Sequence, residues 1–378
     1  MKVLEISAEN YRNLKIENQK FCDGINFIYG ENAQGKTNLI ESIWMLTGAR
    51  SFRGTKDIDI IKFGKNFAKL RAKAYFENRE QEIKLLFSEG KRKAFLNDVP
   101  QKYPTEIIGK FRAVLFSPIH LSLISGAPEK RRKFLDAAIC QLKPTYTALL
   151  IRYNHVLRQR NSFLKNRSQK TDFTLLDVLD NSVARLGASI IWQRLEYMKS
   201  LTTEATKIYS EISGNKEKMK IIYVSRTVKE TNGDLKREEI EKILIEKMHK
   251  TRESDFKFGS TSVGPHKDDL DFYINKKAAK NFGSQGQQRS VALSLKLAEA
   301  DILTKSIGEP PVILLDDVMS ELDDERKSYM IQKTKNRQVF ITGCDKSDLK
   351  IMNCGSIYTV KNGEILGKKN SEGEADVC

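Results

Sequence analysis

Residues 30–37 of this chain read Gly-Glu-Asn-Ala-Gln-Gly-Lys-Thr and match the GxxxxGKT pattern of a phosphate-binding loop. A strand-like apolar run at 25–29 precedes the loop, and a run with helical spacing at 38–46 follows it. In this order backbone N–H groups and the helix start face phosphate oxygens, Lys36 neutralises charge and the Thr37 hydroxyl ligates Mg²⁺. An ordinary glycine turn is the alternative, but it leaves the flanking elements unexplained. The predicted nucleotide-binding residues of this loop are Gly30, Glu31, Asn32, Ala33, Gln34, Gly35, Lys36 and Thr37.

The carboxylate that such a loop needs lies far downstream, at the end of the apolar run 312–315. Asp316 follows Lys36 by 280 positions (316 − 36), and a buried parallel strand delivers its last residue to the ligand-binding edge of a sheet. We therefore predict that Asp316 joins Thr37 as a magnesium ligand and that Asp317 orients or deprotonates a water. The alternative is that both carboxylates merely cap the next helix. On the first reading, the two ends of the chain build one site around a long insertion.

Composition predicts a globular protein. The 378 residues are 40% hydrophobic and 30% charged, which suits two or three structural units. No apolar stretch approaches the roughly 20 residues of a membrane span, and the first residues resemble a strand rather than a signal peptide, so we expect a cytoplasmic location. The five cysteines form no CxxC pair and the four histidines lack zinc-site spacing, which argues against a disulfide framework and a structural zinc.

The formal net charge of +16 indicates a polyanionic partner, with nucleic acid the leading candidate and an anionic membrane surface the second. General solubility charge is the alternative. The distribution argues against it in one segment, because residues 127–170 contain eleven Lys and Arg residues but only Glu129 and Asp136 as acids.

The apolar pattern changes along the chain. Period-two runs predict strands at 3–6, 25–29, 69–76 and 82–87, with a hairpin turn at 88–91. Steps of three and four predict helices through 135–156, interrupted at Pro144, and through 179–208, with a tip at 166–171. Strand patterns return after 221, with a turn at 229–234, and 368–378 resembles a frayed tail.

These changes predict three segments. Residues 1–116 form the N-terminal part of a head with the phosphate loop, 117–220 an inserted helical lobe with a short helical hairpin, and 221–378 the C-terminal part of the head. We expect no helix of the lobe to exceed about six turns.

A further motif begins at Ser284-Gln285-Gly286-Gln287 and leads into a helix with an apolar face at 290–303. Ser and Gly at a helix start expose N–H donors, which gives a second anion-binding end. Taken alone, the motif also fits a simple capped helix start.

The order of these motifs resembles that of ATP-binding-cassette (ABC) ATPase heads, in the DNA-repair branch with SMC and Rad-type proteins. The resemblance is strongest to the RecF family of bacterial replication and repair proteins, and it spans nearly the whole length. The matching segments are 10–14 (Asn-Tyr-Arg-Asn-Leu), 126–136 and 264–270. It implies an α/β fold: an ABC-type P-loop head with a mixed sheet and helices, and an inserted α-helical lobe.

The resemblance also implies roles for particular residues. Lys36, Asp316, Asp317 and Thr342 are expected to be catalytic, with Mg²⁺ held by Thr37 and Asp316. The chain is expected to dimerise around ATP, so that Ser284 of one subunit completes the site of the other. Because Asp317 stands where most cassette ATPases have Glu, we expect slow hydrolysis. The further nucleotide-binding residues implied are Arg12, Asn13, Ser284, Gly286, Gln287 and Asp323.

The function implied is that of an ATP-dependent DNA clamp with slow, DNA-stimulated ATPase activity. Such a clamp binds gapped DNA or junctions of single and double strands. It works with RecR and RecO in loading recombinase, and so supports recombinational repair, replication restart and SOS induction.

Other functions stay open at this point. A related ABC ATPase that organises DNA structurally would need a longer coiled coil. A transporter subunit would have its two nucleotide-binding motifs closer together in sequence. An ABC ATPase fused to a nuclease would need an acidic metal-binding cluster. Two side-chain roles also have alternatives. Arg131 and Arg132 grip DNA phosphates or brace the lobe through Asp136, and the carboxylates of 264–270 are catalytic or belong to a structured turn.

Overall fold

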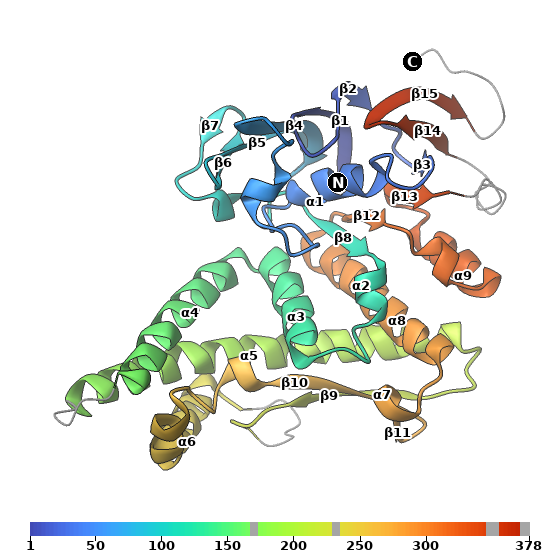
Figure 1. The fold of residues 1–378 in the computed structure, drawn as a ribbon. Coiled ribbons are helices and arrows are strands. Elements are labelled where there is room, and N and C mark those ends of the chain that lie inside the picture. Colours follow the sequence, from blue (N-terminus) through green and yellow to red (C-terminus); the bar gives the residue numbers. More distant parts are fainter. Residues whose placement is uncertain (167–172, 229–234, 345–354, 371–378) are drawn as a thin grey trace. The chain divides into compact units, whose positions relative to one another are not determined.

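The computed structural model describes residues 1–166, 173–228, 235–344 and 355–370 (Figure 1). The chain forms two compact units. The first unit combines Met1–Ser122 with Ala292–Cys378, and the second unit is Leu123–Val291. Segments from both ends of the chain thus share one unit.

The inserted unit begins slightly later than the predicted lobe, at 123 rather than 117, but it is longer because it ends at 291 rather than 220. The strands at 219–224 and 269–274 belong to a small sheet that packs on helices of this unit, so the chain returns to the first unit only with α8 and the later strands. Periodicity identified these strands but carried no information about which core they join.

One sheet of the first unit is antiparallel, with strand order β2–β1–β4–β5–β6–β7. Alternate side chains of β4 are buried, as expected for a sheet with one solvated face. The predicted strands at 3–6, 69–76 and 82–87 lie within it, and 88–91 turns from β5 to β6. The strands are β1 (Lys2–Glu9), β2 (Ile16–Lys20), β4 (Phe67–Phe76), β5 (Arg79–Ser88), β6 (Lys91–Leu96) and β7 (Val99–Pro100).

The second sheet of this unit has the order β15–β14–β3–β13–β12–β8 and is parallel except for β15 at its edge. Its central strands are apolar and buried, as parallel strands covered on both faces are. Residues 368–370, predicted as part of a tail, belong to β15. The strands are β3 (Ile25–Tyr29), β8 (Ala113–Phe116), β12 (Val312–Leu315), β13 (Val339–Gly343), β14 (Ser356–Lys361) and β15 (Glu364–Asn370).

Helix α1 (Lys36–Met45) contributes Leu39, Ile40 and Ile43 to a core that also contains side chains of both sheets. Nearly every residue of α1 is buried, which fixes the helix against the end of β3. The other helices and 3-10 turns of this unit are η1 (Asp57–Ile60), η2 (Pro104–Ile107), α2 (Pro118–Leu121), η4 (Met319–Glu321) and α9 (Asp324–Thr334).

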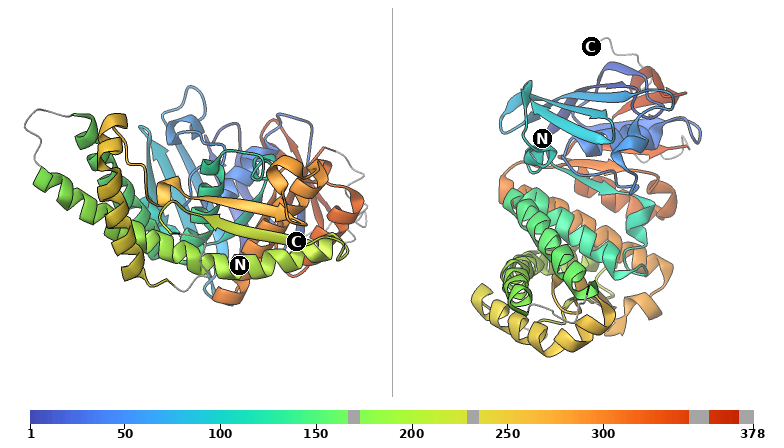
Figure 2. Two further views of the ribbon diagram at one scale, coloured as in Figure 1. Left: turned by 90° about the horizontal axis from the view of Figure 1, so that it is seen from below. Right: turned by 60° about the vertical axis from the view of Figure 1, so that its left-hand side comes forward.

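The second unit is mainly helical, and its three-stranded sheet β11–β10–β9 runs along α5 (Figure 2). Helix α3 ends just before Pro144, which opens α4 because proline fits the first turn of a helix. The elements are α3 (Pro128–Leu142), α4 (Pro144–Lys165), α5 (Phe173–Ile212), β9 (Met219–Val224), α6 (Arg237–Phe258), η3 (Pro265–Lys267), β10 (Asp269–Ile274), β11 (Lys277–Ala278) and α7 (Ala279–Phe282). Helix α8 (Gln285–Ile307) continues the chain from the second unit into the first.

The expected limit of six turns holds for α4, with 22 residues, but is wrong for α5, with 40. At 1.5 Å per residue, α5 is about 60 Å long. It contacts α4, α6 and β9. The predicted tip at 166–171, apart from Asn166, and the predicted turn at 229–234 lie outside the described residues.

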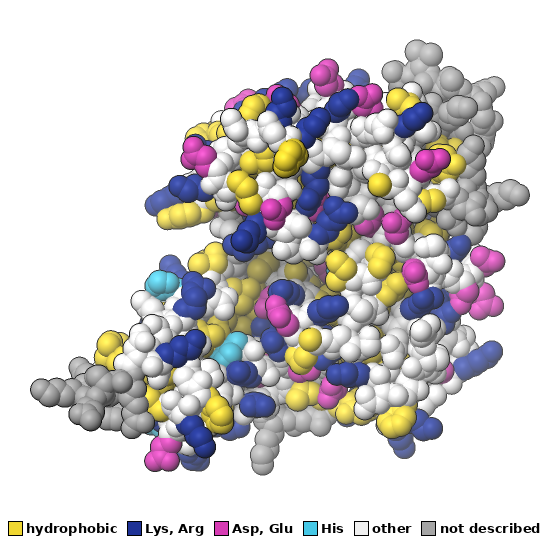
Figure 3. Space-filling view, in the orientation of Figure 1, with side chains coloured by type: hydrophobic (Ala, Val, Ile, Leu, Met, Phe, Trp, Pro, Cys, Tyr) yellow, Lys and Arg dark blue, Asp and Glu magenta, His cyan; other side chains and the backbone are white. Residues whose placement is uncertain are grey.

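Ion pairs inside the second unit engage some of the basic side chains of the segment 127–170. Arg160 is fully buried and donates to Asp180 at 2.6 Å and to Asp255 at 2.8 Å. Arg131 makes a bidentate pair with Asp269, through bonds of 2.6 and 2.8 Å. Part of the charge is therefore structural, and basic side chains are spread over the face in Figure 3 rather than gathered in one patch.

Arg131 and Arg132 both make structural contacts within the second unit. Arg132 donates to the carbonyl of Asp268 at 2.8 Å, beside the Arg131 pair. Bracing through Asp136 is wrong, since Asp136 pairs with Arg194 at 2.9 Å. The Asp268 carboxylate accepts hydrogen bonds from hydroxyls of the same unit, so it belongs to a structured turn.

Candidate nucleotide-binding site

The phosphate loop runs from the end of β3 to the start of α1. Gly35 is the N-cap of α1 with a φ of 115°, a left-handed conformation that favours glycine. A Cβ at Gly30 would clash with the carbonyl oxygen of Val360. Among the described residues no side chain caps α1, so its first N–H groups are available to an anion. The loop geometry is therefore that of a phosphate cradle.

Lys36 is only 4% exposed, and its ammonium group points back into the loop. It donates to the carbonyls of Gly30 at 2.6 Å and Glu31 at 2.9 Å, and to Cys344 Sγ at 3.0 Å. The Cys344 thiol in turn donates to Asn32 Oδ1 at 3.1 Å. Cys344 follows β13 directly, and its contact with the loop lysine was not predicted because no local pattern distinguishes it.

Three neighbouring strands bring the downstream residues to this loop. β13 lies between β3 and β12, and Ile341 is in register with both Phe27 and Leu315. The carboxyl ends of the three strands are therefore level, and the residues that follow them meet at one edge.

The Thr37 hydroxyl donates a hydrogen bond of 2.9 Å to Asp316 Oδ1. The Thr342 hydroxyl donates to the same oxygen at 3.2 Å and accepts from the Asp317 backbone N–H at 2.9 Å. Asp317 has a φ of 51°, a left-handed conformation that is strained for a residue with a side chain. All four residues were predicted for this site, and the structure brings them together.

Burial raises the pKa of Asp316 to about 6, the hydrogen bond from Thr37 opposes this rise, and the charge of Asp317 adds to it. A carboxylate that loses hydration in this way favours a compensating cation.

A pocket of about 120 Å³ lies in front of the loop. Arg53 was not predicted to be there, although it is the only arginine among the lining residues. Its Nη1 donates to Asn38 Oδ1 at 2.8 Å, which holds the guanidinium beside the helix start. Arg53 follows α1 in a polar turn and carries no sequence signal of its own. The lining residues are Asn32, Ala33, Gly35, Lys36, Thr37, Asn38, Arg53 and Asp317.

The loop is supported from behind by Asn13 and by the β14–β15 turn. Asn13 Oδ1 accepts from Asn38 Nδ2 at 2.7 Å. Gln34 accepts from the backbone N–H groups of Asn362 at 2.7 Å and Gly363 at 2.8 Å. Asn13 was predicted to bind nucleotide, whereas the structure places it against the loop. The support from residues 362 and 363 was not predicted.

Arg12 does not line the pocket. Its guanidinium makes a bidentate pair with the fully buried Glu41, with bonds of 2.6 and 3.0 Å, and donates to Thr55 Oγ1 at 2.8 Å. These contacts anchor α1 to the segment that follows β1.

The remaining predicted residues cap helices. Asp323 is the N-cap of α9 and accepts from the Arg326 N–H at 2.9 Å. Ser284 and Gln287 form a reciprocal capping box at the start of α8, and Gly286 lies between them in the sequence. The Ser284 N–H donates to Gln287 Oε1 at 2.9 Å, and the Gln287 N–H donates to Ser284 Oγ at 3.2 Å. Ser284, Gly286 and Gln287 belong to the second unit, unlike the phosphate loop.

Within the described ranges, one cluster has metal-site geometry: Asp177, Asp180 and His249. Arg252 donates to both of its carboxylates, at 2.5 and 2.7 Å, and Arg160 also pairs with Asp180. These cations balance the two acids, so the cluster offers no support for a fused nuclease. No helix in the described part of the chain is both long and apolar enough to span a bilayer.

No protein-family model matches the chain. The chain is 39% identical over 368 residues to the DNA replication and repair protein RecF of Thermoanaerobacter sp. (strain X514), which covers 97% of this chain and 99% of that protein. A solved structure of the recombination mediator protein RecF with ATP in the RecFOR pathway is similar with a TM-score of 0.88 and 39% identity, covering 96% of each chain. An Smc head domain from Pyrococcus furiosus has a TM-score of 0.55 at 15% identity over 98% of this chain and 96% of its own, which supports the ABC ATPase head fold alone. With this similarity over its whole length, the chain belongs to the RecF family of DNA replication and repair proteins.

Proposed function

We propose that this protein is an ATP-dependent DNA clamp that closes as a homodimer on ATP and reopens through slow, DNA-stimulated hydrolysis. The observation that supports this proposal most is the Thr37–Asp316 contact beside a phosphate loop. It joins residues from the two ends of the chain at one pocket, as a nucleotide site of this fold requires.

The oxygen atoms of Thr37 and Asp316 fit a shared magnesium ion. Mg²⁺ prefers oxygen ligands, and a hydroxyl and a carboxylate from these two residues would hold it. Thr37 Oγ1 and Asp316 Oδ1 are separated by 2.9 Å. When bound, Mg²⁺ neutralises the negative charge that develops on the β- and γ-phosphates. Lys36 and Arg53 are the cations next to this position that would hold the remaining phosphate charge.

The arrangement of Asp317 supports a role in positioning water. Its backbone is held by Thr342, and its side chain lines the pocket beside Lys36 and Thr37. A carboxylate there orients or deprotonates the attacking water. Because an Asp side chain is one methylene shorter than Glu, the water is held less closely, and we expect slow turnover.

The start of α8 supports nucleotide-linked assembly. The capping box fixes Ser284 and Gln287 to each other and leaves Ser284 exposed. We infer that this helix start completes the ATP site of a second copy in a two-fold dimer. The RecFOR pathway named for the related structure supports RecR and RecO as partners, at gapped DNA where recombinase is loaded during repair and replication.

The test is the size of the purified protein with and without ATP and gapped duplex DNA. We expect a monomer alone, a dimer with ATP, and a dimer–DNA complex when both are present. Lys36→Met should abolish nucleotide binding. Ser284→Arg should bind ATP but stay monomeric, whereas Ser284→Thr, which keeps the capping hydroxyl, should dimerise. Dimerisation of Ser284→Arg at wild-type strength contradicts the two-fold ATP model.

A further inference from the structure

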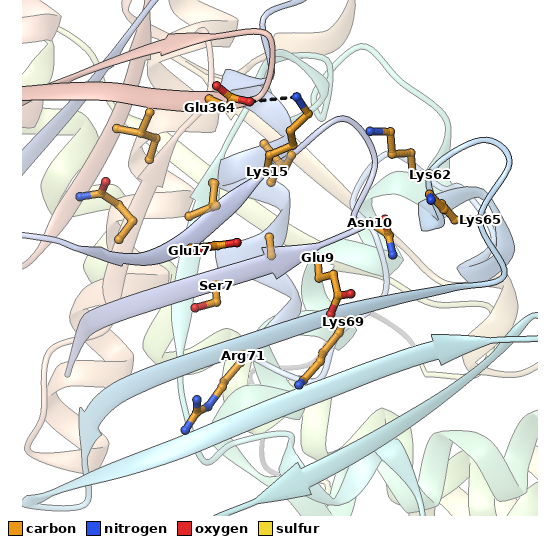
Figure 4. A pocket seen from close by; sticks show the side chains of 15 residues that line it. Ser7, Glu9, Asn10, Lys15, Glu17, Lys62, Lys65, Lys69, Arg71 and Glu364 are labelled. Atoms are coloured by element: carbon orange, nitrogen blue, oxygen red, sulfur yellow. Dashed lines mark hydrogen bonds and ion pairs between the residues drawn. The ribbon is translucent and has the colours of Figure 1, made fainter.

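A pocket of about 850 Å³ lies on the first unit, outside the nucleotide site (Figure 4). It opens on the solvated face of the antiparallel sheet, where Lys69 and Arg71 of β4 alternate with buried residues. These two side chains are two positions apart on one strand, so they stand about 7 Å from each other on the same face. The charged residues that line the pocket are Lys15, Lys62, Lys65, Lys69, Arg71, Glu9, Glu17 and Glu364.

Three of the five basic side chains are available to a ligand. Lys15 pairs with Glu364 at 2.9 Å, and Arg71 pairs with Glu82 at 2.6 Å. Within the described residues, Lys62, Lys65 and Lys69 have no acidic oxygen within the 4.0 Å of an ion pair. Figure 4 shows Lys62 and Lys65 together at the loop before β4 and Lys69 on β4, beside Glu9 of the neighbouring strand β1. Cations that lack an acidic partner at such a pocket favour a polyanion.

An exposed aromatic side chain stands between two of these lysines. Residues 62–65 form a β-turn in which the Lys65 N–H donates to the Lys62 carbonyl at 3.0 Å. Gly64 supplies the φ of 76° that a type II turn needs at its third position. Phe63 precedes it at the tip and is 102% exposed, so no other side chain covers its ring.

The turn is fixed to the sheet on its N-terminal side. The Lys62 N–H donates to the Asn10 carbonyl at 2.8 Å, and the Arg12 N–H donates to the Ile60 carbonyl at 2.7 Å. The backbone that carries Phe63 is therefore fixed, and binding a ligand there needs little ordering of the loop.

We propose that this pocket and turn form a binding site for single-stranded nucleic acid, in which an unpaired base stacks on Phe63 while Lys62, Lys65 and Lys69 neutralise phosphates. Aromatic platforms beside a cationic groove are how single strands are bound without reading sequence. The proposal rests on the DNA-binding function proposed above, and it adds the face of the protein and the type of strand. A membrane is the less suitable occupant because it requires a broad apolar face.

The experiment measures binding of fluorescent oligo(dT) and of a blunt duplex to the full chain with ATP and Mg²⁺, by fluorescence anisotropy. Phe63→Ala should weaken oligo(dT) binding about tenfold, the loss of one stacked base, and leave duplex binding unchanged. Phe63→Trp should restore binding and add fluorescence quenching beyond that of the wild type. The matched control is Phe258→Ala, since Phe258 is 72% exposed beside Lys257 at the end of α6.

The outcomes separate the two proposals. If the wild type binds the duplex and Phe63→Ala binds oligo(dT) as tightly as the wild type does, the single-strand site is wrong and the clamp stands. If the wild type binds neither DNA, both proposals fail. Equal losses for oligo(dT) and duplex also overturn the single-strand site. The same variants are also titrated with anionic phosphatidylserine vesicles. If Phe63→Ala weakens vesicle binding but leaves oligo(dT) binding unchanged, the site is a membrane surface and the single-strand proposal is wrong.

Discussion

The Thr37 hydroxyl donates a hydrogen bond to Asp316 Oδ1 at 2.9 Å, across a sequence separation of 279 residues. Thr37 lies in the first turn of α1 and Asp316 directly follows β12. Strand β13, which lies between β3 and β12, contributes Thr342 to the same oxygen. The contact depends on the alignment of β3, β13 and β12. Any change that shifts these strands shifts the nucleotide site with them.

Asp316→Asn tests the charge at this contact. The amide oxygen still accepts from Thr37, but the negative charge that holds Mg²⁺ is lost. We expect Mg²⁺ affinity with bound nucleotide to fall by about 10- to 100-fold, with a similar fall in hydrolysis. Magnesium titrations of ATP hydrolysis measure this. Asp324→Asn, at an exposed position of α9, is the control and should behave as the wild type. An unchanged magnesium dependence of Asp316→Asn removes Asp316 from the metal site.

Arg53→Ala tests the arginine that sequence analysis missed. If Arg53 holds phosphate charge, the variant should bind ATP about tenfold more weakly, since a charge-assisted hydrogen bond contributes about 1.5–3 kcal/mol. Nucleotide titration by calorimetry gives the affinity. The exposed Arg50, three residues earlier and outside the pocket, supplies the control Arg50→Ala. Equal affinities for both variants would mean that Arg53 only holds Asn38.

Gly363→Ala tests the support behind the phosphate loop. Gly363 has a φ of 82°, and a Cβ there would clash with the carbonyl oxygen of Asn13. We expect a loss of about 1–3 kcal/mol in the free energy of unfolding and weaker ATP binding, because the Gln34 contacts must shift. Chemical denaturation measures the first effect. Gly367→Ala in β15, where the added Cβ meets nothing within 4 Å, should change neither property.

Arg160→Met tests the buried ion pairs of the second unit. The substitution leaves Asp180 with Arg252 as its partner, but Asp255 loses its paired charge. We expect the free energy of unfolding to fall by about 3–5 kcal/mol. Arg158→Met, at an exposed position of the same helix, should stay within about 0.5 kcal/mol of the wild type. A small effect at both positions would show that the buried network can relax.

We expect His266 to make the free energy of unfolding fall in mild acid. Burial lowers its pKa to about 4, and the neutral ring accepts from the Tyr153 hydroxyl at 2.6 Å through Nδ1. Between about pH 6.5 and 4 the unfolded chain takes up a proton that the folded chain does not, so the free energy of unfolding falls as the pH is lowered, by about 3 kcal/mol in total.

Denaturation at pH 7 and pH 5 measures this slope. His266→Asn, whose amide oxygen replaces the Nδ1 acceptor, should flatten it. The control His155→Asn changes an exposed histidine of α4 and should keep the wild-type slope. A wild-type slope in His266→Asn would place the acid sensitivity elsewhere.

Sequence alone determined the features that rest on local chemistry. The glycines of the phosphate loop, the apolar strand ending at Asp316 and the proline that separates α3 from α4 each leave a pattern in a short stretch of chain. The contact between Thr37 and Asp316 was predictable because both motifs serve the same magnesium–nucleotide site. No local pattern indicates that two residues so far apart in the sequence are in contact.

Only the tertiary structure decided where the second unit ends, that Arg12 pairs with Glu41, and that Gly363 supports Gln34. It also decided which charges are paired. Arg131 and Arg160 form ion pairs in the fold, whereas Lys62, Lys65 and Lys69 have no acidic partner in the part of the chain that the structure describes. The physical reason is that periodicity and composition report the environment of a residue within one element. Ion pairs, strand register and steric fit depend on which elements pack together.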